Sequence, residues 1–301
     1  MFENPFEADG KWYKGNLHTH TTGSDGAWAP DKVAAEYRTK GYDFLFITDH
    51  NTVTDVSDLS GDGLLVLNGT ELGAGKSEVG HSYHIVALNL KETVSGRDAP
   101  TLQGLIDLLK SKGAEVVVAH PYWSGLTVKD VIDLEGYLGV EVFNSTCHFS
   151  IAKGHSTVHW DDLLVRGKLV SGFAVDDSHQ HFSDCRPIDI CYAWIMAKLP
   201  ELTEEAVMSA IKSGRFYASN GPTINDISVK DGVISVSTSD VKTINFVADV
   251  SRGKRCAAMG DGLINQADYK LRGSEKYIRV ECFDQYGRGA WSNPVVFNAP
   301  L

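Results

Sequence analysis

The sequence has few cysteines and no long apolar run. Its five cysteines are odd in number and form no C-x-x-C pair, so we expect neither a disulfide framework nor a thiolate zinc site, and a reducing compartment is the default. No run reaches the roughly 18 apolar residues that a membrane span needs. The first residues lack the basic and apolar segments of a signal peptide. We therefore expect a cytoplasmic protein without a membrane partner.

Basic residues are also in deficit. The 301 residues include 28 lysines and arginines against 39 aspartates and glutamates, which gives a formal net charge of −11. Such a surface repels the phosphate backbones of DNA and RNA, so we expect no nucleic-acid partner. A hydrophobic share of 43% is typical of a folded globular protein, and the length allows one large domain or two unequal ones.

Three common catalytic signatures are absent as well. The sequence contains no Walker-type phosphate loop, no dinucleotide-binding glycine fingerprint and no Ser-His-Asp elbow. These absences argue against P-loop, Rossmann and serine-hydrolase chemistry. The candidate chemistry therefore depends on the histidines and the acidic residues.

The first two-thirds of the sequence alternates short β-rich runs with helical patterns. We expect strands at residues 15–18, 42–48, 64–67, 84–88, 115–119, 140–143 and 169–175. Helices are indicated by Pro30 as a first helical residue, by Thr101 and Thr127 as N-caps, and by the patterns at 160–165 and 204–213. Strands that alternate with helices imply parallel pairing, and seven of them favour a closed or nearly closed TIM-like α/β barrel.

The last quarter of the sequence has a different pattern. From Thr223 onward the helical periodicity disappears, and short strand-like runs follow at 224–229, 233–238, 243–248, 277–283 and 294–297. This pattern predicts a small antiparallel β-sandwich. We place the boundary between Gly221 and Pro222, so that residues 1–221 form the barrel domain and residues 222–301 the sandwich domain.

Histidines and acids recur at the ends of the predicted strands. They lie in His18-Thr19-His20, Asp25, Thr48-Asp49-His50, Glu71, His84, His120-Pro121 and Asp177-Ser178-His179. Residues two apart on a strand point to the same side, so both imidazoles of the first motif can hold one cation. Barrel strands end around one pocket, and imidazoles and carboxylates are ligands for Zn, Mn and Fe. One histidine is weak evidence, but repetition at one level on separate strands predicts a metal centre.

This ordered set resembles the PHP (polymerase and histidinol phosphatase) superfamily of metal-dependent phosphoesterases. The resemblance covers about residues 12–220, and the motifs occur in the order of that family. It implies a distorted seven-stranded β/α barrel that holds two or three divalent ions, which agrees with the number of strands expected from the sequence pattern.

The resemblance also implies which residues bind each ion. Carried over by position, the ligands are His18, His20 and Asp177 for the first ion, Glu71 as a bridge to the second, His84 and His120 for the second, and Asp25, His50 and His179 for the third. Asp25 stands where some members have histidine, so the third site is the least defined. His81 is the rival of His84, which we prefer because the apolar run 85–88 follows it directly.

The resemblance implies hydrolysis by a metal-bound hydroxide, with Glu71 and Asp177 as the carboxylates beside it. Three divalent ions, opposed by Asp25, Glu71, Asp177 and a hydroxide, leave a charge of about +2 in the pocket. We therefore expect a small anionic substrate, a phosphomonoester or a phosphodiester.

The C-terminal part resembles one branch of this superfamily, and that resemblance adds a second class of substrate. The run 214–222 and the later Trp291-Ser292-Asn293-Pro294 are similar to the carbaryl-hydrolase-like branch of the superfamily, which includes hydrolases of carbamate esters. A carbamate, carboxyl-ester or amide hydrolase is therefore a second interpretation. A non-catalytic binding module that retains metal is the third.

Four residues outside the ligand set are candidates for substrate contact. Tyr122 and Trp123 follow the fifth strand, where they either stack on a substrate ring or pack the loop. Arg186 and Arg215 are candidate clamps for a phosphate group. Their structural alternatives are a surface position for Arg186 and packing between the two domains for Arg215.

The remaining polar residues near the motifs have supporting interpretations. Asp49 precedes a ligand and is expected to orient its neighbours. Asn144 ends the sixth strand and either faces the pocket or closes a turn. Four further histidines lie outside the motif positions and are assigned no metal: His148, His155, His159 and His181.

Overall fold

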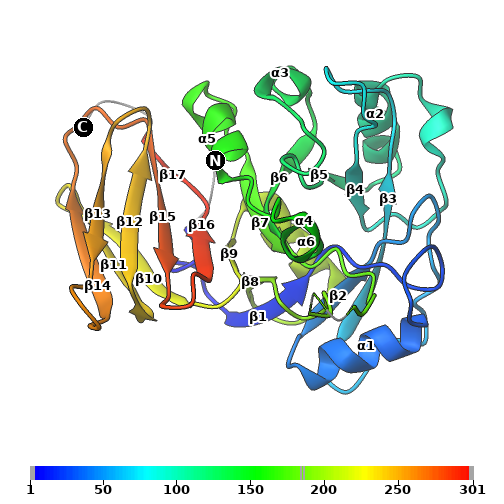
Figure 1. Cartoon of the computed structure of the whole chain (residues 1–301), viewed down its shortest axis with the longest axis horizontal. Helices are drawn as coiled ribbons and strands as arrows, with labels where there is room; N and C mark the ends of the chain where they lie inside the picture. The colour runs from blue at the N-terminus through cyan, green and yellow to red at the C-terminus, as the bar shows by residue number, and fades with distance from the viewer. Residues whose placement is uncertain (1–3, 184, 186, 298–301) are drawn as a thin grey trace.

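The computed structural model describes residues 4–183, 185 and 187–297, and Figure 1 shows their arrangement. The strands are β1 (Lys11–Asn16), β2 (Phe44–Ile47), β3 (Leu65–Leu72), β4 (Ile85–Leu88), β5 (Glu115–Val118), β6 (Tyr137–Asn144), β7 (Ser171–Val175), β8 (Trp194–Leu199), β9 (Phe216–Ser219), β10 (Ile224–Lys230), β11 (Val233–Val241), β12 (Thr243–Ala248), β13 (Gly253–Ala257), β14 (Ile264–Lys270), β15 (Tyr277–Phe283), β16 (Gly289–Ser292) and β17 (Val295–Val296). The helices are α1 (Pro30–Thr39), α2 (Leu102–Ser111), α3 (Val128–Val131), α4 (Ser145–Ile151), α5 (Thr157–Val165) and α6 (Glu204–Ser213), with a 3-10 helix, η1 (Gly96–Asp98). The fold is therefore mixed α/β, and the described residues after α6 form strands and loops.

One large sheet runs through most of the molecule. Its strand order is β13-β12-β15-β16-β9-β8-β1-β2-β3-β4-β5-β6-β7, with β17 paired to β15. Strand β1 lies inside this order and β7 at its end, yet the residues that follow these two strands meet. Thr19 and Ser178 form a parallel bridge there, and the Asp177 N–H donates to the His18 carbonyl at 2.9 Å. The residues that follow β1 and β7 are thereby held side by side.

The helices that were predicted from capping and first-turn residues are present in the structure, because such residues act on the helix end next to them. Thr101 Oγ1 accepts the N–H of Gly104 at 3.1 Å and so caps α2, as the sequence predicts. The apolar stripe of α2 is buried, and it consists of Leu102, Leu105, Ile106 and Leu109. Pro30 begins α1, and Gly214 ends α6 in a left-handed conformation with φ +73°. None of the described helices combines the length and apolar character that a membrane crossing requires.

The parallel pairing expected for all seven strands is wrong at β4. This strand pairs antiparallel with both β3 and β5, whereas β1–β2, β2–β3, β5–β6 and β6–β7 pair in parallel. The connection from β3 to β4, residues 73–84, contains no helix and is at the lower limit of the dozen or more residues that a parallel crossover needs. The beginning of β4 therefore lies at the sheet edge where β2, β3 and β5 end, and His84 lies at this edge although it precedes its strand.

The C-terminal strands form two facing antiparallel layers, at the left of Figure 1. A separate sheet of order β10-β11-β14 packs on β12 and β15, with Ile234 and Val236 on one side and Phe246 and Val280 on the other. The larger sheet continues from β8 through β9 into β16, where Ser219 pairs with Ala290. Hydrogen-bonded strands thus join the segments before and after residue 221, and the division into two domains there stays a prediction.

Candidate metal centre

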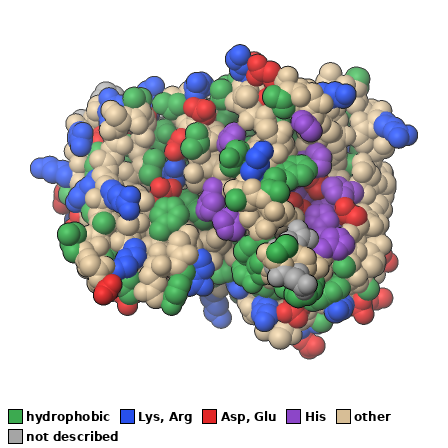
Figure 2. All heavy atoms as spheres, in the orientation of Figure 1, with side chains coloured by type: hydrophobic (Ala, Val, Ile, Leu, Met, Phe, Trp, Pro, Cys, Tyr) green, Lys and Arg blue, Asp and Glu red, His purple; other side chains and the backbone are tan. Residues whose placement is uncertain are grey.

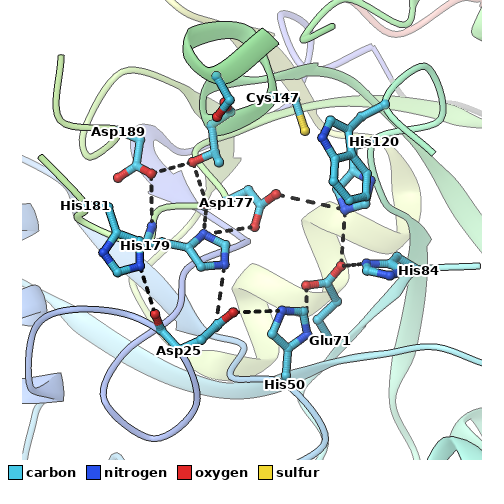
Figure 3. Close-up of a pocket in the computed structure, with 13 residues that line it drawn as sticks. Asp25, His50, Glu71, His84, His120, Cys147, Asp177, His179, His181 and Asp189 are labelled. Carbon is cyan, nitrogen blue, oxygen red and sulfur yellow. Dashed lines mark hydrogen bonds and ion pairs between the residues drawn. The ribbon is translucent and has the colours of Figure 1, made fainter. Parts of the chain in front are cut away.

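The predicted ligands meet in one hollow of the molecule. A cavity of about 400 Å³ opens beside the strand ends, and Figure 2 shows histidine side chains gathered there on one face. Its lining consists of Asp25, His50, Glu71, His84, His120, Trp123, Thr146, Cys147, Ser150, Asp177, His179, His181 and Asp189 (Figure 3). His18 and His20 lie beneath this lining and are buried completely. All nine predicted ligands therefore lie at the cavity or directly below it.

The first donor group is the most compact. It consists of His18, His20, Glu71 and Asp177, and all four are buried. His18 Nε2 lies 3.1 Å from His20 Nε2, 3.1 Å from Glu71 Oε2 and 3.2 Å from Asp177 Oδ1. His20 Nε2 lies 3.2 Å from the same Glu71 oxygen and 3.1 Å from the same Asp177 oxygen. The donor atoms thus surround one point.

These spacings fit a divalent cation at the centre of the group. Four ligand atoms bound tetrahedrally at about 2.0–2.1 Å are separated from one another by roughly 3.3 Å. The distances of 3.1–3.2 Å around His18 and His20 are close to that value. Two imidazole nitrogens also face each other here, and a shared cation accounts for their lone pairs better than a hydrogen bond between them.

The second donor group shares a residue with the first. Glu71 Oε1 lies 2.7 Å from His84 Nδ1 and 3.2 Å from His120 Nε2, while Glu71 Oε2 belongs to the first group. The other nitrogen of His120 lies 2.9 Å from Ser124 Oγ, which orients the ring. His81, the rival of His84, lies in none of the donor groups among the described residues. The single carboxylate of Glu71 can thus bridge two ions.

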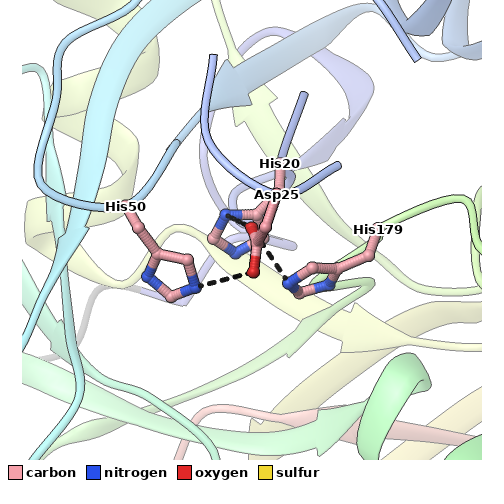
Figure 4. Close-up of side chains that lie close together, drawn as sticks. All are labelled: His20, Asp25, His50 and His179. Atoms are coloured by element: carbon pink, nitrogen blue, oxygen red, sulfur yellow. Dashed lines mark ion pairs between the residues drawn. The ribbon is translucent and has the colours of Figure 1, made fainter. Parts of the chain in front are cut away.

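The third donor group is more open (Figure 4). Asp25 lies 3.7 Å from His50 Nε2 and 3.5 Å from His179 Nε2, and its side chain is 55% exposed. His20 borders this group as well, with its Nδ1 3.8 Å from Asp25 Oδ1. That buried Nδ1 has no hydrogen-bond partner among the described residues. The group is therefore wider than the first one and accessible to solvent on the Asp25 side.

The histidines and carboxyl groups of the site shift one another's pKa values. Burial opposes charge on His18 and His20, but Asp177, Glu71 and their neighbours outweigh it and raise the pKa of both rings, that of His20 to about 9. Burial alone would raise the pKa of Glu71 and Asp177, yet the His18 charge and the histidine hydrogen bonds lower it. The pocket therefore stabilises positive charge at the position where the donor atoms converge, and a bound cation would replace those protons.

Two buried residues of β6 hold the ligands in place, and the sequence analysis assigned a role to only one of them. Glu141 Oε1 lies 2.6 Å from His18 Nδ1, and its Oε2 accepts the His120 backbone N–H at 2.8 Å. Asn144 donates to Glu141 Oε2 at 2.9 Å and to Asp177 Oδ2 at 3.0 Å from behind the cavity lining, and its Oδ1 accepts the Cys147 N–H and caps α4. The only sequence signal for Glu141 is a glutamate in an otherwise apolar strand.

Two further aspartates fix the loops that carry ligands. Asp49 accepts hydrogen bonds from Thr21, Ser24 and Thr54, which holds the loop leading to Asp25. Asp189 is buried and accepts hydrogen bonds from four donors next to Asp177 and His179: the side chains of Thr146 and Ser178 and the N–H groups of His179 and Gln180. Asp189 has no motif around it, and the sequence analysis did not select it.

The structure separates the residues proposed for substrate contact. Trp123 lines the cavity, whereas Tyr122 lies outside the lining with its ring 6.0 Å from His159. Arg215 donates to Ser209 and Ser213 of α6 and also lies outside the lining. Arg186 lies outside the described residues.

The four additional histidines differ in position. His181 lines the cavity with its Nε2 3.2 Å from the Asp25 carbonyl oxygen. His148 and His155 pack around Phe143 instead, and none of the four belongs to a donor group among the described residues.

Comparison with known proteins identifies similar structures. No protein-family model and no curated protein sequence matches this chain. A two-domain protein from Bacteroides vulgatus containing a predicted PHP-like metal-dependent phosphoesterase is 15% identical, with a TM-score of 0.52 over 94% of each chain. This likeness shows a shared fold that extends over nearly the whole length of both chains.

Two further solved structures resemble parts of the chain less closely. An amidohydrolase from Chromobacterium violaceum with bound sulfate and no metal is 17% identical over 57% of this chain and 93% of its own, with a TM-score of 0.44. A candidate metal-dependent phosphoesterase from Bifidobacterium adolescentis is 18% identical over 66% of this chain and 96% of its own, with a TM-score of 0.47.

Proposed function

We propose that this chain is a metal-dependent hydrolase of the PHP superfamily that cleaves small phosphate esters. The observation that carries this proposal is the position of Glu71, whose two oxygens belong to two adjacent donor groups. A carboxylate shared in this way places two cations next to each other. Paired divalent ions, when bound, lower the pKa of water to about 7 and polarise a phosphoryl oxygen.

The ligand assignment follows the three donor groups. We assign His18, His20, Asp177 and Glu71 to the first ion, Glu71, His84 and His120 to the second, and Asp25, His50 and His179 to a third, with Zn, Mn or Fe as the metal. The imidazole and carboxylate donors suit each of these metals. The distorted barrel of the superfamily is part of the same proposal, supported by the bridge that joins the residues after β1 and β7.

The chain's own residues would orient the reactants. Asn144 occupies Asp177 Oδ2, which leaves Oδ1 directed toward His18 and His20. Without ions, the neighbouring histidines lower the pKa of Glu71 and Asp177 against the effect of burial, and bound cations would keep both carboxylates ionised in their place. We therefore assign these two carboxylates to hold the ions that would activate the attacking water and to orient that water.

A second candidate function has one observation in its favour. The described residues that line the cavity include no lysine or arginine to bind a phosphate group directly. A carbamate, carboxyl ester or amide would need no such cation, and the same donor set suits its hydrolysis. We rank it second because the bound ions themselves would supply positive charge for a phosphate.

One substrate panel tests both candidates. The protein is loaded with Mn or Zn, its metal content is measured, and it is assayed with 4-nitrophenyl phosphate, bis(4-nitrophenyl) phosphate, 4-nitrophenyl acetate and 4-nitrophenyl methylcarbamate. These compounds share a leaving group, so differences report the bond that is cleaved. We expect turnover of a phosphate ester, and its absence in metal-loaded protein would overturn the proposal.

A matched variant separates an enzyme from a binding module that only retains metal. His20→Ala removes a donor of the first group, so we expect loss of hydrolysis with an unchanged circular dichroism spectrum. His148→Ala is the control, because His148 belongs to no donor group. Hydrolysis by His20→Ala at the wild-type rate would exclude the assigned site.

A further inference from the structure

We propose that Trp123 makes the enzyme selective for esters whose leaving group is a flat, uncharged, apolar ring. This inference rests on the proposed function, because it concerns the part of the substrate that lies away from the reacting bond. Three features of the cavity support it: the position of the indole, the charge of the lining and the contrast with the neighbouring Tyr122.

The indole of Trp123 lies against two of the assigned ligands. Its ring centroid is 4.9 Å from that of His120 and 5.9 Å from that of His84, so one side of the indole packs on the second donor group. The turn that carries it is tied to His120, because the Ser124 N–H donates to the His120 carbonyl at 3.1 Å. Trp123 is still 43% exposed and lines the cavity. A large flat surface is therefore presented at a fixed distance from the reacting position.

The charge of the lining disfavours a second anionic group on the substrate. The described lining residues contain four carboxylates, those of Asp25, Glu71, Asp177 and Asp189, and no lysine or arginine. The bound ions would offset the carboxylates at the reacting bond. Asp189 lies at the cavity with its oxygens already occupied by hydrogen bonds from the protein. A leaving group that carried its own negative charge would meet no partner, whereas an uncharged ring would gain contact with the indole.

The rest of the described wall contains no lysine, no arginine and no further carboxylate. Helix α4 contributes Thr146, Cys147 and Ser150 to the lining. Burial raises the pKa of the Cys147 thiol, so this side chain stays neutral. The wall outside the donor groups and Asp189 thus combines the Trp123 indole and the His181 imidazole with small side chains, so flat rings and small groups make up the surface that a leaving group would contact.

Tyr122 supplies a control within the same loop. It is also 43% exposed, but it does not line the cavity, and its ring lies near His159 and the Lys153 ammonium. The two neighbours therefore have the same aromatic character and the same exposure, and differ in whether they face the site. A general effect of removing a surface aromatic will appear in both variants, and a substrate contact only in Trp123.

The test compares phenyl phosphate with glycerol phosphate in the metal-loaded wild type, Trp123→Ala, Trp123→Phe and Tyr122→Ala. For each variant, the ratio of kcat/KM for phenyl phosphate to kcat/KM for glycerol phosphate is divided by the same ratio for the wild type. This division cancels the different intrinsic reactivity of the two esters. We expect Trp123→Ala to lose about 10-fold on phenyl phosphate and less than about 2-fold on glycerol phosphate. Trp123→Phe should keep most of the selectivity, and Tyr122→Ala all of it.

A structural role would give a different result. If Trp123 only supports His84 and His120, Trp123→Ala will slow both esters equally, and equal losses or no loss would overturn the inference. Binding of neutral phenol to the metal-free protein, followed by NMR, tests the contact without any turnover. If no ester is hydrolysed but phenol binds the wild type and not Trp123→Ala, the proposed function fails while the assigned contact stands. If phenol binds both proteins equally, the contact fails.

Discussion

Two buried side chains of β6 that belong to no donor group hold residues of the pocket in place. Glu141 contacts His18 and His120 through its two oxygens, and Asn144 links it to Asp177. Two residues of β6 thus hold ligands that belong to three other segments. An acceptor for the second nitrogen of a ligand histidine fixes its tautomer and raises its basicity, so the affinity for metal depends on residues that bind none.

Glu141→Gln is expected to weaken metal binding by about 10–100-fold, because the amide carries no charge and offers only one acceptor oxygen to the His18 ring and the His120 N–H. Competition with a chromophoric chelator measures this change. Glu115→Gln is the matched control, since Glu115 is also buried in a strand but pairs with Lys110 and Lys212 rather than with ligands. Equal affinity of Glu141→Gln and the wild type would contradict the role assigned to Glu141.

At the scale of elements, one buried arginine joins the C-terminal strands to the α/β part. Arg279 of β15 donates to both oxygens of Asp161 on α5 at 2.8 Å and to Glu281 at 2.8 Å, and it lies over the Trp160 ring. The Arg279 side chain is buried. Its removal leaves two carboxylates without their partner, which is costlier than the loss of a surface ion pair.

Arg279→Met is therefore expected to lower the free energy of unfolding by about 3 kcal/mol. Arg288→Met is the control, because the Arg288 side chain is 53% exposed and its pair with Asp284 is expected to contribute less than about 1 kcal/mol. Urea denaturation followed by tryptophan fluorescence measures both variants. Equal stability of the two would show that the Arg279 contacts do not join the layers energetically.

The carboxyl group of Glu275, in the turn between β14 and β15, is expected to make the stability of the protein depend on pH. Burial raises the pKa of Glu275, but hydrogen bonds from Tyr269 and the Arg272 and Ser274 N–H groups outweigh it and lower the pKa to about 2. A lowered pKa stabilises the fold above the unfolded value of about 4.3, and this contribution disappears as the pH falls toward 2.

Glu275→Gln should therefore be less stable than the wild type at pH 6, and the gap should narrow as the pH is lowered from 4.5 toward 2.5. Chemical denaturation at a series of pH values measures the gap. A gap that stays constant over that range would mean that the ionised carboxylate is not the stabilising form.

Local signals explain which elements could be predicted from the sequence. Thr101 and Pro30 mark helix starts through local effects, and the pattern at 204–213 indicates a third helix; all three helices were predicted correctly. The predicted ranges omit β8, β9, β13, β14 and β16. Of these strands, β13 and β14 are largely exposed and carry little apolar alternation. The direction of β4 was also missed, since strand pairing depends on partners far along the chain.

Some residues of the candidate site could likewise be predicted from the sequence, and others could not. The nine residues proposed as ligands could be selected because they recur in motifs, and the structure brings them together at or directly below one cavity. Glu141 and Asp189 could not be selected, because each is a single acid whose partners come from distant segments. The separation of Trp123 from Tyr122 likewise depends on the path of the loop, which spacing alone does not define.

At the scale of the whole molecule, the donor groups draw ligands from segments between β1 and the end of β7. Cations bound there would link these segments and stabilise the folded state alone, since the unfolded chain holds no preformed site. An ion present at about 100 times its dissociation constant adds about 2.7 kcal/mol. That value corresponds to a rise of roughly 4 °C in Tm for a chain of this size.

Removal of metal with a chelator is accordingly expected to lower Tm by about 4 °C or more, and Mn or Zn should restore it. Differential scanning calorimetry measures the shift. His20→Ala provides the control, because its Tm should respond less to added metal. A Tm that is unchanged by chelation in the wild type would indicate that no ion binds the folded protein tightly.

The position of bound ions in a crystal tests the central proposal most directly. Anomalous diffraction from crystals grown with Mn or Zn locates each ion without reference to activity. We predict two or three ions within the cavity, with Glu71 bound to two of them through its separate oxygens. Ions found only elsewhere, or a cavity without anomalous density at saturating metal, would contradict the proposed centre.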